Sequence, residues 1–219
     1  MMNRNRMSPK PGINGLYAIT PDCLDTVNLL HRTRLVLSGG ARVLQYRNKL
    51  ADAALRLKQA TALRELTHEF SATFIVNDDA QLAARIDADG VHLGKSDDEL
   101  ITARDRLGNH KIIGISCYNH LSLAREAIAG GADYVAFGAF FPSKVKPDAV
   151  NADIELLLRA RSEIAVPLVA IGGITVQNAA KLISSGADAL AVISALFDAA
   201  DIQASAQNFS KLFIQDSAS

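Results

Sequence analysis

Three alternating polar residues follow the second apolar segment of the chain: Gln45, Arg47 and Lys49. In an extended segment every second side chain points to the same face, so the two cations and the amide would lie together. An arginine guanidinium can hold two oxygens of a phosphate at once, and lysine adds a compact positive charge. The run therefore predicts a clamp for an anion, although a strand end that faces solvent would show the same pattern.

Two carboxylates follow the next two apolar segments, Asp78 after the third and Asp97 after the fourth. Mg²⁺ in proteins prefers one or two carboxylates, while water and substrate phosphate oxygens complete its coordination. An aspartate that precedes a helix can instead cap it, and Asp79 and Asp98 are the more natural caps. We therefore interpret Asp78 and Asp97 as ligands of a magnesium ion beside the anion clamp.

Polar groups also follow the later apolar segments. Ser116 ends the fifth, and a long loop (138–147) follows the sixth, which is typical of a lid or clamp. Backbone N–H groups around Gly173 and Ser194, after the seventh and eighth segments, would form a phosphate site of the kind found in barrel enzymes. His92 lies within a segment, and we expect a packed or hydrogen-bonded core residue rather than a general base.

The elements that must position these residues alternate regularly along the chain. The apolar segments show little alternation, as strands buried on both faces of a parallel sheet do, and each precedes a helical stretch. The expected strands are 16–20, 43–46, 73–76, 90–93, 111–115, 134–137, 167–171 and 189–193, and the expected helices are 26–37, 51–69, 80–86, 100–107, 121–129, 151–163, 176–185 and 202–213.

This order predicts an α/β fold, a single (β/α)₈ TIM barrel over residues 13–215, with residues 1–12 as a disordered tail. An open, doubly wound sheet is the main alternative. Glycine-containing turns such as 129–133 and 184–188 would end a helix just before a strand. Because the carboxyl ends of barrel strands meet at one mouth, the polar groups described above would converge there.

Composition excludes several classes of protein. The chain has 219 residues, of which 49% are hydrophobic and 21% charged, and its 23 basic residues balance its 23 acidic ones. A net charge of zero argues against nucleic acid or an anionic membrane as partner, and no apolar run reaches the roughly 20 residues that span a bilayer. The first residues lack a secretory signal, and two distant cysteines indicate free thiols in the cytoplasm. A homo-oligomer is compatible with this sequence.

Taken in order, these motifs resemble the thiamine phosphate synthase family, over almost the whole chain after the N-terminal tail. Each motif is short, and the set is specific. The matching runs are Q-x-R-x-K at 45–49, N-D at 77–78, G-V-H-L-G-x-x-D at 90–97, G-x-S at 114–116, G-A-D-Y-V at 131–135 and A-I-G-G-I at 170–174.

The resemblance implies a transferase of thiamine biosynthesis. It would join a hydroxymethylpyrimidine diphosphate to a hydroxyethylthiazole phosphate and release pyrophosphate, with Mg²⁺ on Asp78 and Asp97 bridging the leaving diphosphate. The implied pyrimidine diphosphate ligands are Gln45, Arg47, Lys49, Asn77, Ser116 and Lys146, among which Arg47, Lys49, Ser116 and Lys146 would be catalytic. The implied thiazole phosphate ligands are Ser143, Val145, Gly173, Ile193 and Ser194. Departure of diphosphate before attack by the thiazole nitrogen requires charge stabilisation and positioning rather than a protein nucleophile.

Three positions depart from the family pattern. The family's T-x-T-K run is Ser143 to Lys146 here, so Val145 lacks the hydroxyl of the second threonine. Lys95 stands where glutamine is common, and Ala139 where proline is common.

Alternatives to the synthase function are a thiazole tautomerase of the same fold, a phosphosugar isomerase or epimerase, and a barrel that only binds thiazole phosphate. The diphosphate clamp with its paired aspartates favours the synthase.

Overall fold

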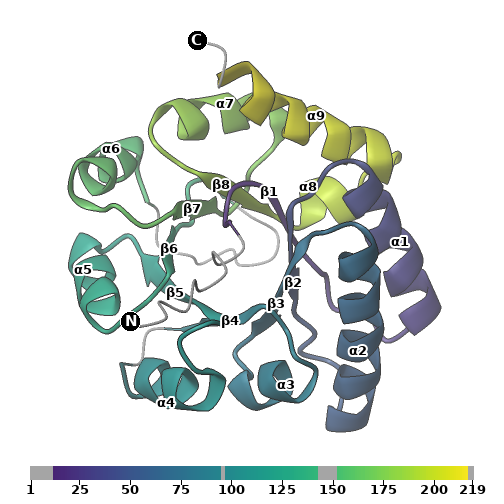
Figure 1. Ribbon diagram of the computed structural model, residues 1–219. Coiled ribbons are helices and arrows are strands. Elements are labelled where there is room, and N and C mark those ends of the chain that lie inside the picture. The colour runs from purple at the N-terminus through teal and green to yellow at the C-terminus, as the bar shows by residue number, and fades with distance from the viewer. Residues whose placement is uncertain (1–11, 95–96, 143–151, 217–219) are drawn as a thin grey trace, which may run out of the picture.

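Eight parallel strands pair in the order of the sequence, and β8 pairs with β1 to close a barrel. The computed structural model describes residues 12–94, 97–142 and 152–216, without the side chains of residues 97, 98, 215 and 216. The predicted tail (1–12) lies outside the described residues except for residue 12. Figure 1 looks into the barrel, with the helices arranged as an outer ring. The closed pairing confirms the (β/α)₈ barrel and rules out the open sheet.

The strands and helices lie close to their predicted ranges. The strands are β1 (Gly15–Ile19), β2 (Val43–Tyr46), β3 (Thr73–Asn77), β4 (Gly90–Leu93), β5 (Ile112–Tyr118), β6 (Tyr134–Phe137), β7 (Leu168–Ile171) and β8 (Ala189–Val192). The helices are α1 (Thr26–Ser38), α2 (Ala53–Glu69), α3 (Ala80–Arg85), α4 (Asp97–Leu107), α5 (Leu121–Ala129), α6 (Ile154–Glu163), α7 (Val176–Ser184), α8 (Ser194–Phe197) and α9 (Ile202–Asp216). Helix α8 was not predicted.

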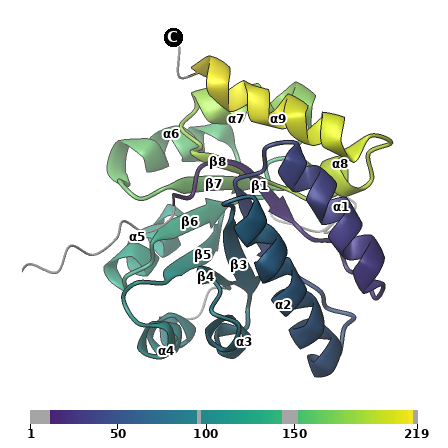
Figure 2. The same ribbon diagram turned by 45° about the vertical axis from the view of Figure 1, so that its right-hand side comes forward.

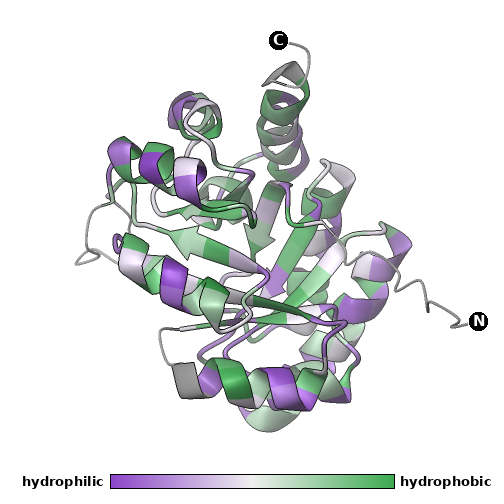
Figure 3. Ribbon diagram, turned by 60° about the vertical axis from the view of Figure 1, so that its left-hand side comes forward, coloured by the Kyte–Doolittle hydropathy of each residue, from purple (hydrophilic) through white to green (hydrophobic). Residues whose placement is uncertain are grey.

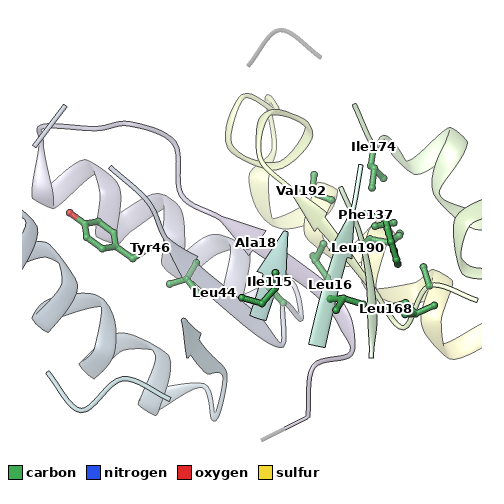
Figure 4. Close-up of a cluster of buried hydrophobic side chains, with 14 of the residues drawn as sticks. Leu16, Ala18, Leu44, Tyr46, Ile115, Phe137, Leu168, Ile174, Leu190 and Val192 are labelled. Atoms are coloured by element: carbon green, nitrogen blue, oxygen red, sulfur yellow. The ribbon is translucent and has the colours of Figure 1, made fainter. Parts of the chain in front are cut away.

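Apolar side chains form two layers, one on each face of the strands. The larger layer lies between the strands and the helices and includes Leu16, Leu44 and Ile115 (Figure 4). The smaller one includes Tyr17 and Tyr134, whose hydroxyls meet at 2.8 Å although β1 and β6 are not neighbours, so it fills the barrel interior. Burial on both faces explains why the strands read as continuous apolar runs, and Figure 3 shows helices with mixed polarity around them.

The interior leaves room for Tyr134 only because β5 carries a glycine there. A Cβ added to Gly114 would lie 1.9 Å from the Tyr134 ring. Gly114 and Tyr134 are partners in the register of β5 and β6, so the ring lies over the backbone of the neighbouring strand. A small residue opposite a large one is how barrel interiors are filled without voids.

An aspartate precedes each of three even-numbered strands and ties the amino-terminal end of the barrel together. Asp133, before β6, accepts a hydrogen bond from the backbone N of Ile113 at 2.9 Å and pairs with Arg104 of α4 at 2.7 Å. The same arrangement recurs with Asp89, Phe74 and Arg64, and with Asp188, Leu168 and Arg161. The glycine turns before β6 and β8 have positive φ at Gly131 and Gly186, as helix ends of this kind require.

No helix among the described ranges has the length and apolar character needed to cross a membrane.

Both cysteines are free thiols, and Cys117 is fully buried. Burial raises the pKa of the Cys117 thiol to about 12, with a further contribution from the charge of Glu126. The thiol therefore stays protonated at neutral pH and behaves as a small apolar core group.

We expect Asp133→Ala to lower the free energy of unfolding by about 2 kcal/mol, because it leaves the strand N–H of Ile113 and the Arg104 guanidinium without this acceptor. Urea denaturation of the whole chain measures the change. Asp105→Ala, which removes an exposed carboxylate from α4, is the control and should change stability by less than about 0.5 kcal/mol. Equal effects of the two substitutions would contradict a structural role for the aspartate before β6.

Candidate functional site

A cavity of about 540 Å³ opens beside the carboxyl ends of β2, β3 and β4, and residues of α2, α3 and α4 also line it. Figure 2 shows these three helices as neighbours along the outside of the barrel. Arg47, Lys49, Asn77 and Asp78 line the cavity together. The structure thus gathers four of the residues that the sequence assigned to a diphosphate and metal site. Arg56 of α2 and Arg106 of α4 line the same cavity and had not been predicted. Four cations from three elements face three carboxylates (Asp78, Asp79 and Glu99) in this lining, so a polyanionic ligand meets a small excess of positive charge.

An aspartate from the loop after β1 holds the anion clamp in place. Asp22 lies 3.3 Å from Nη1 of Arg47 and accepts a hydrogen bond from the backbone N of Lys49 at 2.6 Å. The hydroxyl of Thr20 bridges the backbone of Arg47, donating to its O and accepting from its N, each at 2.9 Å. Sequence reasoning missed Asp22, although it follows a strand as the other site residues do. It is a positioning group for the two cations.

Asn48, which lies between the two cations in the sequence, holds the loop after β2 in place through its side chain. Its side chain is buried, donates to the backbone O of Cys23 at 2.6 Å and to Gln59 at 3.0 Å, and accepts from the backbone N of Leu50 and Ala51. These contacts connect the loop after β2 to the loop after β1 and to α2. Apart from its position between Arg47 and Lys49, nothing in the sequence singles out Asn48.

Asp78 adopts a backbone conformation that few residues tolerate, with φ of +60°. Its backbone N donates to the O of His92 at 2.8 Å, and its carboxylate accepts a hydrogen bond from Asn77 at 2.6 Å. Aspartate and asparagine enter this left-handed region more readily than most residues. Asp79 caps α3 by accepting from Leu82 N at 2.8 Å, as expected. Asp97 begins α4, and its side chain lies outside the described residues.

Gln45 and Ser116 occupy the barrel interior, apart from the cavity that Arg47 and Lys49 line. Gln45 is 3% exposed and donates to the hydroxyl of Tyr17 at 2.8 Å. Tyr17 bonds Tyr134, and the ring of His92 bonds Tyr134 through Nδ1 and Ser116 through Nε2, each at 2.9 Å. His92 is thus a hydrogen-bonded interior residue. Sequence reasoning missed the tyrosines because they lie in apolar runs.

The two tyrosine hydroxyls keep their protons. Burial is the main cause that raises the pKa of Tyr17 and of Tyr134 far above the usual value of a phenol. A buried phenolate would have no cation among the partners described for these two oxygens, so the neutral form is favoured. The two phenols are therefore neutral hydrogen-bonding groups of the barrel interior.

The loops after β7 and β8 place backbone groups on the opposite side of the mouth. Gly173 has φ of +60°, and Asn178 donates to its O at 3.1 Å. A Cβ on Gly173 would lie 2.4 Å from the O of Pro142, so glycine is required where this loop passes the loop after β6. Ile193 precedes α8 and Ser194 begins it. A short extra helix after β8 is a common phosphate-binding element in this fold.

Three predicted site residues fall outside the described part of the chain. They are Ser143, Val145 and Lys146, and Lys95, which departs from the family pattern, also lies outside it. The predicted site is thus described for Gln45, Arg47, Lys49, Asn77, Asp78, Ser116, Gly173, Ile193 and Ser194.

A family model, curated relatives and a solved structure that match this chain are all described as thiamine phosphate synthases or pyrophosphorylases. Residues 16–196 match the family model described as thiamine monophosphate synthase. The chain is 58% identical to a thiamine-phosphate synthase of Methylobacillus flagellatus, over 93% of this chain and 97% of that protein. It is 51% identical to one of Nitrosospira multiformis, over 99% and 92%. A solved thiamine phosphate pyrophosphorylase of Pyrococcus furiosus superposes with a TM-score of 0.83 at 36% identity, covering 92% of this chain and 96% of that one.

We expect Arg47→Ala to weaken the binding of inorganic pyrophosphate by about tenfold or more, because charge-assisted hydrogen bonds from a guanidinium are lost. Isothermal titration calorimetry at fixed ionic strength measures the dissociation constant. Arg42→Ala is a matched control, since Arg42 directly precedes β2 at the other end of the strand and bonds Asn14. Equal weakening in both variants would show that only net charge matters and that the cavity is not a specific anion site.

Proposed function

The chain belongs to the thiamine monophosphate synthase family, and we propose the roles that its residues play in the reaction of that family. It is a transferase that forms thiamine phosphate. The reaction joins 4-amino-2-methyl-5-hydroxymethylpyrimidine diphosphate to 4-methyl-5-(2-hydroxyethyl)thiazole phosphate and releases pyrophosphate. The observation that carries the assignment of roles is the cavity shared by Arg47, Lys49, Asn77 and Asp78.

The residues of this cavity fit a magnesium ion. Mg²⁺ needs oxygen ligands and takes several of them from water and from substrate phosphates, so one or two carboxylates suffice. Asp78 supplies a carboxylate at the cavity wall, and the described residues contain no group of three acidic, histidine or cysteine side chains that would form a closed cage. We propose that Asp78 and Asp97 hold Mg²⁺, which would neutralise charge on the diphosphate.

Arg47 and Lys49 bind the diphosphate oxygens and stabilise the charge that develops when the leaving group departs. The bond between the pyrimidine methylene carbon and the diphosphate oxygen breaks, and the electron pair stays with pyrophosphate. The cations gain most when this charge appears, which is how electrostatic catalysis lowers a barrier. Asp22 and Thr20 hold the clamp before substrate arrives, so little reorganisation is needed. Lys146 would add a third cation.

The pyrimidine ring lies over the barrel interior next to the cavity, so Gln45 and Ser116 of the interior and Asn77 of the cavity wall offer it neutral hydrogen-bonding groups. Neutral partners suit this position because the pyrimidine methylene becomes a cation when the diphosphate leaves. The thiazole nitrogen then attacks that carbon with its lone pair, and no protein nucleophile is required. The contribution of the barrel is to keep the two substrates at reacting distance.

The thiazole phosphate binds on the other side of the mouth, at the backbone of Gly173, Ile193 and Ser194. The loop after β7 meets the loop after β6 where Gly173 approaches the O of Pro142. Ser143 and Val145 would complete this phosphate site, and Val145 can contribute only its backbone N–H.

We also propose a cytoplasmic location, because the two cysteines are free thiols.

The direct test mixes both substrates with Mg²⁺ and measures thiamine phosphate and pyrophosphate as they form. Stoichiometric appearance of the two products supports the proposed roles of the two phosphate sites. Binding of thiazole phosphate without product would instead favour a barrel that only binds this ligand, and interconversion of thiazole isomers would favour a tautomerase.

We expect Asp78→Asn to lower Mg²⁺-dependent turnover about 100-fold or more, while the melting temperature changes by only a few degrees. Asparagine suits the test because it tolerates positive φ almost as well as aspartate, so the backbone at Asp78 is preserved.

The matched control is Asp79→Asn, which keeps a side-chain acceptor for the cap of α3 and should retain activity. Loss of folding in Asp78→Asn, or full activity at unchanged magnesium concentration, would contradict a role in metal binding.

A further inference from the structure

A continuous hydrogen-bond chain crosses the barrel interior from Gln45 to Ser116 through Tyr17, Tyr134 and His92. Its four links measure 2.8, 2.8, 2.9 and 2.9 Å, and the residues come from β2, β1, β6, β4 and β5. We propose that this chain has a fixed direction and presents Ser116 to the ligand as a hydrogen-bond donor. The proposal rests on the proposed function only for the identity of that ligand, a pyrimidine ring.

The direction is set at the Gln45 end. The amide nitrogen of Gln45 can only donate, so the Tyr17 oxygen accepts from it. Each tyrosine hydroxyl has one proton, and both stay protonated because of their burial. Tyr17 therefore gives its proton to Tyr134, the remaining partner of its oxygen among the bonds described. A buried hydroxyl that donated to no acceptor would carry a desolvation penalty.

The histidine passes this direction on to the serine. The Tyr134 oxygen, having accepted from Tyr17, donates to Nδ1 of His92. A neutral imidazole has one protonated and one unprotonated nitrogen, so an accepting Nδ1 places the proton on Nε2. That N–H donates to the Oγ of Ser116, which leaves the serine proton to point elsewhere. The pyrimidine proposed at this end has ring nitrogens that accept such a proton.

Packing keeps the chain in this arrangement. Tyr17 and Tyr134 are each 1% exposed or less, and their rings meet edge to face at a centroid distance of 6.2 Å. The His92 ring stacks on Tyr134 with centroids 5.5 Å apart and an interplanar angle of 25°. Gly114 leaves the space that the Tyr134 ring fills. Tyr17, Tyr134 and His92 are thus positioning residues that act through Ser116.

The first test measures the tautomer of His92 by ¹⁵N NMR on histidine-labelled protein without substrate. The signals of His92 are identified by their loss in His92→Gln. At neutral pH we expect the Nε2–H tautomer, and in Tyr134→Phe the Nδ1 resonance should shift because its donor is gone. An Nδ1–H tautomer or an imidazolium in the unmodified protein, or an unshifted Nδ1 in the variant, would overturn the proposal.

Tyr46→Phe is the matched control for this measurement. Its hydroxyl is also buried and bonds Gln59 at 2.9 Å, but the side chain belongs to the layer between strands and helices (Figure 4). It should leave the His92 resonances unchanged while costing a similar amount of thermal stability. A shift of His92 in this control as large as in Tyr134→Phe would show a general effect of core disruption and would overturn the interpretation.

The second test is a double-mutant cycle on kcat/KM for the pyrimidine diphosphate. Tyr134→Phe should lower kcat/KM about tenfold in the unmodified protein but less than about twofold in the Ser116→Ala background, because both changes remove the same donor. A merely structural role would give the same factor in both backgrounds and would overturn the proposal. Because the NMR test uses the resting protein, absence of synthase activity would sink the proposed function without deciding the direction of the chain.

Discussion

The backbone pairing between β8 and β1 is the interaction on which the arrangement of the whole mouth depends. It brings Gly15 N to within 2.9 Å of the O of Asp188 and places the two ends of the sheet edge to edge. The carboxylate of the same aspartate holds the backbone N of Leu168 and pairs with Arg161. One residue therefore secures β7, β8, β1 and α6 together. Without this closure, the loops after β7 and β8, the proposed phosphate-binding loops, would not face the cations after β2.

Closure also explains the division of chemistry within the mouth. The charged groups, Arg47, Lys49 and Asp78, line a cavity at its rim, where water can reach them and limit the cost of desolvation. The buried interior uses an amide, two phenols, an imidazole and a hydroxyl, which can be satisfied by one another. Charges in that interior would need partners that the surrounding apolar layer does not offer.

The barrel could be predicted from the sequence because each strand contributes side chains to both apolar layers. Burial on both faces of a strand produces a continuous apolar run. The sequence placed Arg47, Lys49, Asn77 and Asp78 together because parallel strands in a barrel share one mouth. Helix α8 was missed because four residues are too short to show a helical period. Asp22 was missed because its role depends on contacts with Arg47 and Lys49, and nothing in a local run of residues indicates such a contact.

Tyr17 and Tyr134 illustrate a different limit. Within their segments they read as apolar strand residues, and their hydroxyls acquire a role only when β1 and β6 face each other across the barrel. Gly114 is similar, since the space that it leaves is meaningful only beside the Tyr134 ring. The alternation of inward and outward side chains predicts which residues enter the interior, but which of them meet there depends on the tilt and register of the closed sheet.

His92 joins the two parts of the mouth through its backbone and its side chain. Its backbone O accepts from the N of Asp78, which holds that residue at positive φ beside the cavity. Its ring contacts Ser116 and Tyr134 in the interior. A strained residue persists only where its surroundings determine it fully, and here the neighbouring strand does so. The Asp78 carboxylate, proposed to face the diphosphate, and the Ser116 hydroxyl, proposed to face the pyrimidine, are therefore both positioned by one residue of β4.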